Sequence, residues 1–362
     1  MIKAPIFLFL LALLLNLVES LDELLKNDPY SKLIGMVRKE IVDKALLYLP
    51  KREEINILQM FIQMTKAKEE YSLSEADSAY LAYKWIELNI KWEDSDNEDL
   101  GSIYNSGKGS PFGISTLFNT ICSYLEVESG SIYGSYKFIE IGIYKNYNYT
   151  WNYVLINGSY YLIDAIMDNF LDYGESYIFH KDLFFGTNPE IFIRSHFPEK
   201  TKWQLLSEPY TREQFYSLAF LEPTFYIYGF KTISPDTYEL SGSGKIIMTY
   251  NKSISDFEIY SIIVDEDLID IEKNECNYGN GTAEIKFNIN DERAAFLLIF
   301  VGPENVAQYS FVRYKIKSSK IKNFYSNLKR ETLSILKIKN TNFITQNTLK
   351  RFEQKKIKND KN

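Results

Sequence analysis

Residues that commonly hold metals are scarce in this sequence. It contains 2 Cys and 2 His among 362 residues, which argues against a zinc site of the usual Cys and His kind. Long apolar runs are missing after the first 20 residues, which excludes a polytopic membrane protein. A composition of 45% hydrophobic and 25% charged residues excludes a collagen, a coiled-coil rod and a disordered chain. We therefore expect a globular protein with neither a metal nor a cofactor.

Aromatic residues, by contrast, are abundant. They make up 15% of the chain, with 28 Tyr and 24 Phe, and such side chains pack well on pleated sheets. The length is sufficient for two domains that each bury a core. Composition alone therefore favours a strand-rich protein of two domains.

Charge is distributed unevenly along the chain. The formal net charge is -7, yet residues 315–362 carry 14 Lys and Arg against 3 Asp and Glu. A basic tail on an acidic body is typical of an arm that binds an anionic surface, or of self-association through opposite charges. A solvated terminus is the alternative. Aromatic residues in the tail are too sparse for base stacking, so nucleic acid is not an expected partner.

The N-terminus has the pattern of a secretory signal. Lys3 precedes an apolar run over residues 6–15, and small residues lead to a cleavage point after Ser20. The run is shorter than the roughly 20 apolar residues that span a bilayer. We therefore predict that residues 1–20 are a signal peptide and that the mature protein is secreted without a transmembrane span. An uncleaved signal anchor is the alternative.

Secretion would make several Asn residues candidate acceptors of N-linked glycan. The sequons are at Asn148, Asn251 and Asn280. A fourth sequon, at Asn157, precedes Gly158 in the dipeptide preferred by two-residue hairpin turns. We expect no glycan there, because the sugar would sit on a tight turn.

Helical patterns precede strand patterns in the first half of the chain. Residues 21–71 form a helical segment, and residues 72–75 are a capping box that opens a further helix. Residues 93–109, rich in Asp, Glu and Asn, are predicted to be a loop before a helix that contains residues 114–125. The apolar period then changes to two. The predicted strands cover residues 131–144 and 151–164, the second region folding at the Asn-Gly pair. Helices followed by an antiparallel sheet describe an α+β domain.

The second half reads as strands alone. Short apolar runs separated by turn residues predict a β-sandwich of immunoglobulin type. The predicted strands are residues 225–230, 245–250, 257–264, 283–289, 296–301 and 310–316.

Six short strings stand in a fixed order within residues 75–206. They are YKWIELNIKW at 83–92, SGKGSPFG at 106–113, WN at 151–152, YYLID at 160–164, SHFP at 195–198 and KWQLL at 202–206. In order and spacing this part of the chain resembles the transglutaminase-like superfamily, in the branch of kyphoscoliosis peptidase and the fungal cytokinesis regulators. The resemblance implies a papain-like domain, and the strand-rich segment after it resembles the C-terminal β domain of that branch.

Active members of that superfamily use a Cys-His-Asp triad whose Cys opens a helix after a Gly-rich turn. The resemblance places the Cys at Pro111, the His at Tyr149 and the Asp at Asp164, so only the Asp is present. Ser110 can cap the helix and Pro111 fits its first turn, which preserves the helix start without a nucleophile. A phenol is a poor general base because its ordinary pKa is about 10. The resemblance therefore implies no catalytic residues and a remaining binding cleft formed by Ser110, Tyr149, Trp151 and Asp164.

Other reactive side chains offer alternatives. Ser110, beside the vacant position, would be the relocated nucleophile of a cysteine-independent hydrolase or acyl transferase. That alternative requires Ser110 within hydrogen-bonding reach of Tyr149 or His196. We otherwise interpret His196 as structural. Cys122 could pair with Cys276 in an oxidising lumen, but its place on the apolar face of a helix favours a buried free thiol.

Taken together, the sequence predicts an α+β papain-like, transglutaminase-like domain followed by an immunoglobulin-like β-sandwich. We expect a secreted, catalytically inactive protein that binds a protein or peptide, because the groove of the superfamily accepts an extended peptide. The predicted segments are a signal peptide at 1–20, a helical segment at 21–71, the transglutaminase-like domain at 72–206, the β-sandwich at 207–318 and the basic tail at 319–362.

Overall fold

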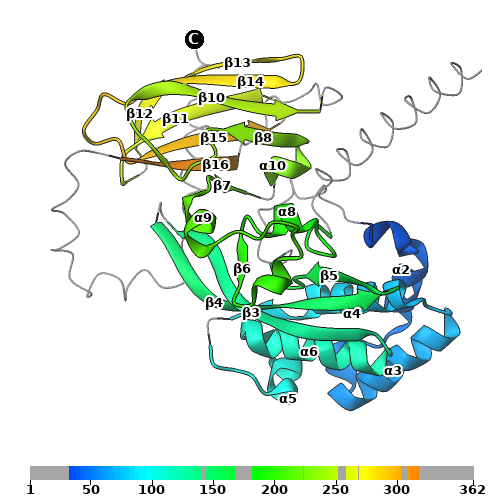
Figure 1. The fold of residues 1–362 in the computed structure, drawn as a ribbon. Helices are drawn as coiled ribbons and strands as arrows, with labels where there is room; N and C mark the ends of the chain where they lie inside the picture. The colour runs from blue at the N-terminus through cyan, green and yellow to red at the C-terminus, as the bar shows by residue number, and fades with distance from the viewer. Residues whose placement is uncertain are drawn as a thin grey trace, which may run out of the picture. The chain divides into compact units, whose positions relative to one another are not determined.

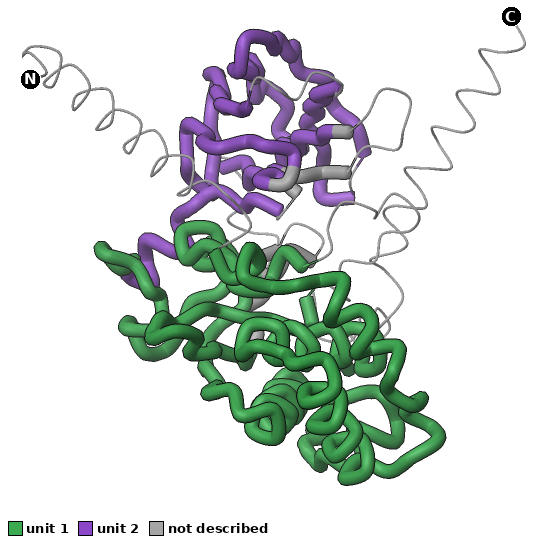
Figure 2. Tube along the Cα trace, turned by 90° about the vertical axis from the view of Figure 1, so that its right-hand side faces the viewer, with its two compact units in different colours: residues 1–137, 146–210 green, residues 138–145, 211–362 purple. Residues whose placement is uncertain are grey.

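The structure is a computed structural model that describes residues 32–93, 95–140, 143–167, 182–222, 224–251, 258–267, 269–302 and 309–317. The predicted signal peptide and the predicted basic tail lie outside the described residues. The chain divides into two compact units, residues 1–137 with 146–210 and residues 138–145 with 211–362 (Figure 2). Among the described residues, no helix is both long enough and apolar enough to cross a membrane.

Unit 1 combines helices with an antiparallel sheet, which confirms the predicted α+β class (Figure 1). The strands of its main sheet follow the order β5-β4-β3-β6, and β1 pairs with β2 in a separate two-stranded sheet. The elements are η1 (Ile34–Met36), α2 (Lys39–Tyr48), η2 (Arg52–Glu54), α3 (Ile57–Glu70), α4 (Glu75–Asn89), β1 (Lys91–Trp92), α5 (Leu100–Ser106), β2 (Lys108–Gly109), α6 (Pro111–Tyr124), β3 (Glu128–Glu140), β4 (Ile143–Ile156), β5 (Ser159–Ile163), α8 (Pro189–Phe192), β6 (His196–Pro198) and η4 (Thr201–Gln204).

The start of α4 ties the N-terminal segment to the rest of unit 1. The capping box is formed by Ser74 and Asp77, two residues later than predicted. Asp77 is fully buried, and its carboxylate also accepts hydrogen bonds from the backbone N–H of Arg38 at 2.7 Å and from its guanidinium at 2.6 and 2.9 Å. One carboxylate thus completes the capping box of α4, whose N-cap is Ser74, and anchors the chain just before α2.

The segment predicted as a loop at residues 93–109 contains a helix, so that prediction was wrong in part. The carboxylate of Asp99 accepts a hydrogen bond from the N–H of Ser102 at 2.7 Å and caps α5. Ile103 and Tyr104 are buried in the same helix, which ends at Gly107 in the left-handed conformation. Two buried side chains and a cap are enough to fold a short helix inside an acidic segment.

Unit 2 contains two sheets, in the orders β13-β14-β10-β8 and β12-β11-β15-β16-β7, with β9 pairing with β16. The strand prediction at residues 225–230 was wrong for most of that range, because a helical turn fills its first half and strand β8 begins only at Phe230. The elements are α9 (Arg212–Ser217), β7 (Phe220–Leu221), α10 (Thr224–Ile227), β8 (Phe230–Ser234), β9 (Glu239–Leu240), β10 (Ser243–Tyr250), β11 (Glu258–Val264), β12 (Asp270–Lys273), β13 (Glu275–Gly279), β14 (Thr282–Asn288), β15 (Phe296–Gly302) and β16 (Tyr309–Ile316).

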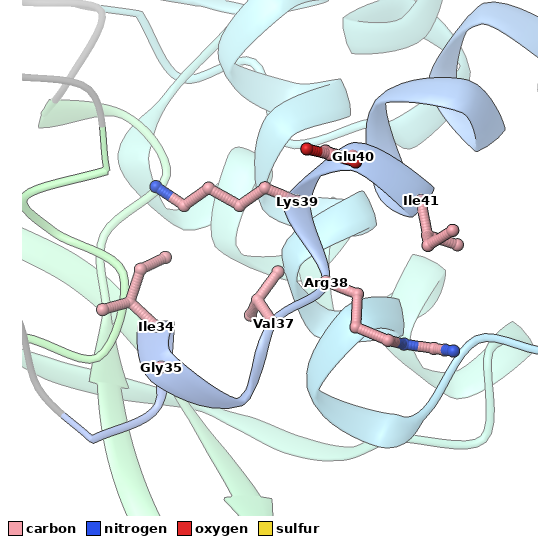
Figure 3. A pocket seen from close by; sticks show the side chains of 7 residues that line it. All are labelled: Ile34, Gly35, Val37, Arg38, Lys39, Glu40 and Ile41. Carbon is pink, nitrogen blue, oxygen red and sulfur yellow. The ribbon is translucent and has the colours of Figure 1, made fainter.

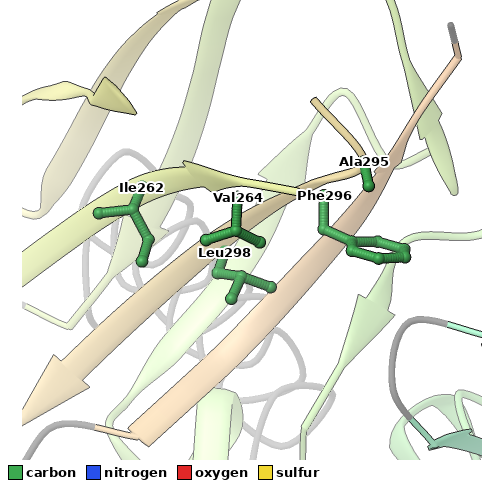
Figure 4. Packing of buried hydrophobic residues seen from close by; sticks show 5 residues of the cluster. All are labelled: Ile262, Val264, Ala295, Phe296 and Leu298. Carbon is green, nitrogen blue, oxygen red and sulfur yellow. The ribbon is translucent and has the colours of Figure 1, made fainter. Parts of the chain in front are cut away.

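The strands β11 and β15 bury apolar side chains on both of their faces. One face carries Ile262 and Val264 opposite Leu298 and Phe296, all on the same side of the two strands in Figure 4. The alternate residues, such as Leu297, are buried as well. This explains why both strands read as continuous apolar runs in the sequence.

Two hairpin turns in the chain share one geometry. Asn157 and Gly158 join β4 to β5 with φ values of 50° and 76°, as the Asn-Gly dipeptide predicts. Asn280 and Gly281 join β13 to β14 with φ values of 53° and 80°. A glycan at Asn280 would therefore sit on the same kind of tight turn as one at Asn157, and we expect a glycan at neither residue.

Candidate functional site

The N-terminus of α6 is built as the sequence predicts. Ser110 caps the helix, because its hydroxyl oxygen accepts a hydrogen bond from the N–H of Gly113 at 3.1 Å, and Pro111 is the first helical residue. Gly113 allows close packing, since an added Cβ would lie 2.5 Å from the Cδ1 of Ile103 and 2.8 Å from the carbonyl oxygen of Asn97. The first helical residue of α6 is therefore Pro111, whose side chain has no nucleophilic atom.

Asp164 follows β5 and is the polar centre of the site. It is 1% exposed, and one carboxylate oxygen, Oδ1, accepts hydrogen bonds from the N–H groups of Ile166 at 2.9 Å and Met167 at 3.2 Å. The hydroxyl of Tyr149 on β4 donates to the same oxygen at 3.4 Å. The other oxygen, Oδ2, lies 3.0 Å from Nε2 of His196 on β6. Each carboxylate oxygen of Asp164 thus contacts one side chain of the site, Oδ1 the hydroxyl of Tyr149 and Oδ2 the imidazole of His196.

His196 is buried among aromatic rings. Its imidazole stacks on Phe192 with ring centroids 4.0 Å apart, and the rings of Tyr136, Trp151 and Phe184 lie 5.0 to 5.6 Å away. Such packing holds the plane of the imidazole in place and keeps water away from it.

The pairing of β3 with β6 brings His196 to this position. Tyr136 is directly opposite His196, and Gly134 is opposite Pro198. A Cβ on Gly134 would lie 2.3 Å from the carbonyl oxygen of Phe197 and 2.5 Å from the Trp151 ring, so glycine is required for this close approach. The pair of His196 and Asp164 was not predicted from the sequence, in which 32 positions separate the two residues.

The hydrogen-bond directions around His196 follow from the chemistry of its partners. An ionised carboxylate only accepts, so Nε2 of His196 carries the proton that faces Asp164. In the neutral imidazole Nδ1 then accepts, and the hydroxyl of Ser195, 2.8 Å from Nδ1, donates to it. Ser195, His196 and Asp164 therefore form a continuous chain of hydrogen bonds.

Tyr149 is a hydrogen-bond donor in this site. Burial raises its pKa well above the ordinary value, and the negative charge of Asp164 raises it further. The phenol therefore stays protonated at neutral pH and cannot accept a proton from a nucleophile.

Residues on β4 divide between the two faces of the sheet. The amide nitrogen of Asn152 lies 2.9 Å from the hydroxyl of Ser115 and 2.9 Å from the side-chain oxygen of Asn119, both on α6. Trp151, which neighbours Asn152 on the strand, contacts His196 instead. Among the described residues, no hydrogen bond joins Ser110 or Pro111 to Tyr149 or His196. The contact on which the Ser110 alternative depends is therefore not made.

The cysteines and the described acidic residues offer no second reactive centre. Cys122 is buried and unpaired, and burial raises the pKa of its thiol to about 12. Cys276 is also unpaired, so the two do not form a disulfide. Within the described ranges, no three Cys, His, Asp or Glu side chains are grouped so that they could bind a metal.

A shallow pocket of about 470 Å³ lies elsewhere in unit 1, at residues 34–41 (Figure 3). Its two cationic side chains form ion pairs, Arg38 with Asp77 and Lys39 with Asp182. The pocket shares no residue with the Asp164 site.

Comparison with known proteins supports the resemblance. No model of a known protein family matches the chain. Two curated proteins, the kyphoscoliosis peptidases of Mus musculus and Homo sapiens, are each 26% identical to it over 132 residues, which is 34% of this chain and 20% of each relative. The matched segment is thus a fifth of the length of those relatives.

Solved structures give weaker likenesses. A transglutaminase crystal structure covers 29% of this chain and 30% of its own, with 13% identity and a TM-score of 0.24. The M1 domain of titin covers 23% of this chain and 86% of its own, with 14% identity and a TM-score of 0.18. Both scores are too low to support an argument about fold. The sequence comparison alone carries the conclusion: over a third of its length, the chain is a distant homologue of kyphoscoliosis peptidase, a transglutaminase-like protein.

Proposed function

We propose that this protein is a transglutaminase-like protein that lacks the thiol chemistry of that superfamily and acts by binding a protein or a peptide. The observation that carries the proposal is the start of α6. Where the resemblance expects the nucleophilic Cys, Pro111 occupies the first helical position, and the neighbouring hydroxyl of Ser110 accepts a capping hydrogen bond. A helix that would stabilise a thiolate has kept its start and has no thiol to stabilise.

The base position supports the same proposal. Tyr149 stands where the resemblance expects the catalytic His, and its buried hydroxyl donates to Asp164. A protonated phenol with a raised pKa does not take a proton from a nucleophile near neutral pH. The nucleophile and the base of a thiol protease or transglutaminase are therefore both absent from the positions where the resemblance expects them.

A peptide or an extended protein segment is the ligand that the homology favours. The relatives are named peptidases, and a domain that loses its nucleophile can keep the groove that accepts the chain. We propose further that the protein enters the secretory pathway, on the strength of the signal pattern at its N-terminus.

The test uses the full-length protein expressed in a eukaryotic secretory host. We expect no amine incorporation into glutamine-containing substrates and no cleavage of a peptide library above background, together with capture of a peptide or protein ligand. The matched control carries Pro111→Cys and Tyr149→His, which supply the two missing residue types without altering Asp164. Thiol-dependent turnover by the wild-type protein, blocked by iodoacetamide, would contradict the proposal.

A further inference from the structure

We propose that the hydroxyl of Ser195 is an activated nucleophile, assisted by His196 and Asp164, that reacts with the acyl group of esters with good leaving groups. This inference is independent of the proposed function, which concerns a missing thiol at residue 111 and a binding groove. Asp164 is the residue common to both, since it would orient an imidazole in the superfamily and contacts a different imidazole here.

The three groups are linked by two hydrogen bonds. Oγ of Ser195 lies 2.8 Å from Nδ1 of His196, and Nε2 of His196 lies 3.0 Å from Oδ2 of Asp164. Asp164 is itself held by two backbone N–H groups on Oδ1. The carboxylate therefore fixes the tautomer of His196 and leaves Nδ1 as the acceptor for the hydroxyl proton. This is the order of roles in a Ser-His-Asp relay, with the two imidazole nitrogens exchanged.

Burial also separates the roles. Asp164 and His196 are each 1% exposed, whereas Ser195 is only partly buried. Ser195 is thus the member of the relay that is most exposed to solvent. The aromatic rings around His196 keep water away from the imidazole and from the carboxylate of Asp164. In such surroundings a carboxylate attracts an imidazolium more strongly than it does in solvent.

The reaction proceeds in two balanced steps. Oγ attacks the carbonyl carbon of the ester as its proton moves to Nδ1, and the bond to the leaving oxygen breaks as that oxygen takes the proton from Nδ1. The acyl group remains on Ser195 as an ester. Water then attacks this ester with proton transfer through the same nitrogen, which releases a carboxylic acid and restores the hydroxyl. The relay supplies proton transfer only, so we expect reaction with activated esters and not with amides, which need further stabilisation of the oxyanion.

The experiment treats the full-length protein with a fluorophosphonate probe and with p-nitrophenyl acetate, and locates the label by peptide mass spectrometry. We expect the label on Ser195, and Ser195→Ala should lower ester turnover to the background rate. The matched control is Ser123→Ala, which removes an exposed hydroxyl of α6 and should leave labelling unchanged.

Asp164→Asn separates a relay from a structural role. The amide oxygen can keep the two backbone N–H groups, and its NH₂ group then faces His196, so the proton of the neutral imidazole shifts to Nδ1. Nδ1 can no longer accept from Ser195, and labelling should fall on the order of 10²-fold or more with the fold retained in thermal unfolding. Absence of label on the wild-type protein, or labelling that survives Ser195→Ala or Asp164→Asn, would overturn the inference. None of these results would affect the proposed function, which is tested by thiol-dependent turnover and by ligand capture and not by labelling of Ser195.

Discussion

Replacing Asp77 by Ala should destabilise unit 1 by about 2.5–4 kcal/mol. The carboxylate accepts hydrogen bonds from the backbone and guanidinium of Arg38 and from the backbone and hydroxyl of Ser74, and it is fully buried. Loss of the Asp77 half of the capping box costs about 1 kcal/mol, and loss of hydrogen bonds to a charged group costs about 1.5–3 kcal/mol more. The side chain of Arg38 is 49% exposed and can return to water, so the loss should stay below the upper limit for a broken buried ion pair, about 5 kcal/mol.

The assay is thermal and urea unfolding of the full-length protein. A unit of about 200 residues loses roughly 2–4 °C of melting temperature per kcal/mol, so we expect a decrease of about 5–16 °C. The matched control is Glu75→Ala, an exposed acidic residue in the same helical turn, which should change stability by less than about 0.5 kcal/mol. A loss below about 1 kcal/mol for Asp77→Ala would show that Arg38 and the N-terminal segment are not held by this carboxylate.

Acid should reveal the same interaction. Burial on its own raises the pKa of Asp77, but the hydrogen bonds from Arg38 and Ser74 outweigh it, and the pKa is lowered overall. A carboxyl with a lowered folded pKa stabilises the protein above its unfolded pKa of about 3.9 and loses that contribution as the pH falls through the folded pKa. Below about pH 4, therefore, the wild-type protein should approach the stability of Asp77→Ala, and the difference between them should be largest near neutral pH.

Four further predictions follow from the site and from the ends of the chain. Pro111→Cys should place a thiol with a pKa below the ordinary 8.5 at the start of α6, measurable as faster alkylation than Cys276 near pH 7; equal rates would contradict it. Asn152→Ala should lower the free energy of unfolding, measured in urea, by about 2–3 kcal/mol, because the buried hydrogen bonds from Asn152 to α6 are lost. A decrease below about 0.5 kcal/mol would refute this expectation. Mass spectrometry of protein made in a eukaryotic secretory host should find Leu21 or a near neighbour as the first residue, whereas retained Met1 in a membrane fraction would indicate an anchor. Removal of residues 319–362 should abolish salt-sensitive binding to heparin or anionic vesicles, and equal binding by both forms at low salt would exclude the tail as an arm.

Features set by neighbouring residues could be predicted from the sequence. The capped start of α6 depends on Ser110 and Pro111 alone, and the turn between β4 and β5 depends on Asn157 and Gly158. Their geometry follows from local steric and hydrogen-bonding preferences, which the rest of the fold does not change.

Features set by tertiary contacts could not. The contact of His196 with Asp164 requires β6 to pair with β3 beside the end of β5. No spacing of residues in the sequence predicts that pairing. The helix α5 was missed because the segment around it is rich in acidic and polar residues, whereas only two buried side chains, Ile103 and Tyr104, stabilise the helix. The strands β12 and β13 were missed because they lie at sheet edges, where exposed and charged residues hide the apolar pattern.

The glycine at residue 134 has a consequence for how this protein can change over generations. It touches neither Asp164 nor His196, yet any side chain there would collide with the backbone of β6 and move the strand that carries the imidazole. Random substitution should therefore be tolerated far less at Gly134 than at other buried positions of the sheet. In distant relatives, a glycine at this position would mark the chains in which an imidazole from β6 can still reach the carboxylate, even where the surrounding residues have diverged beyond recognition.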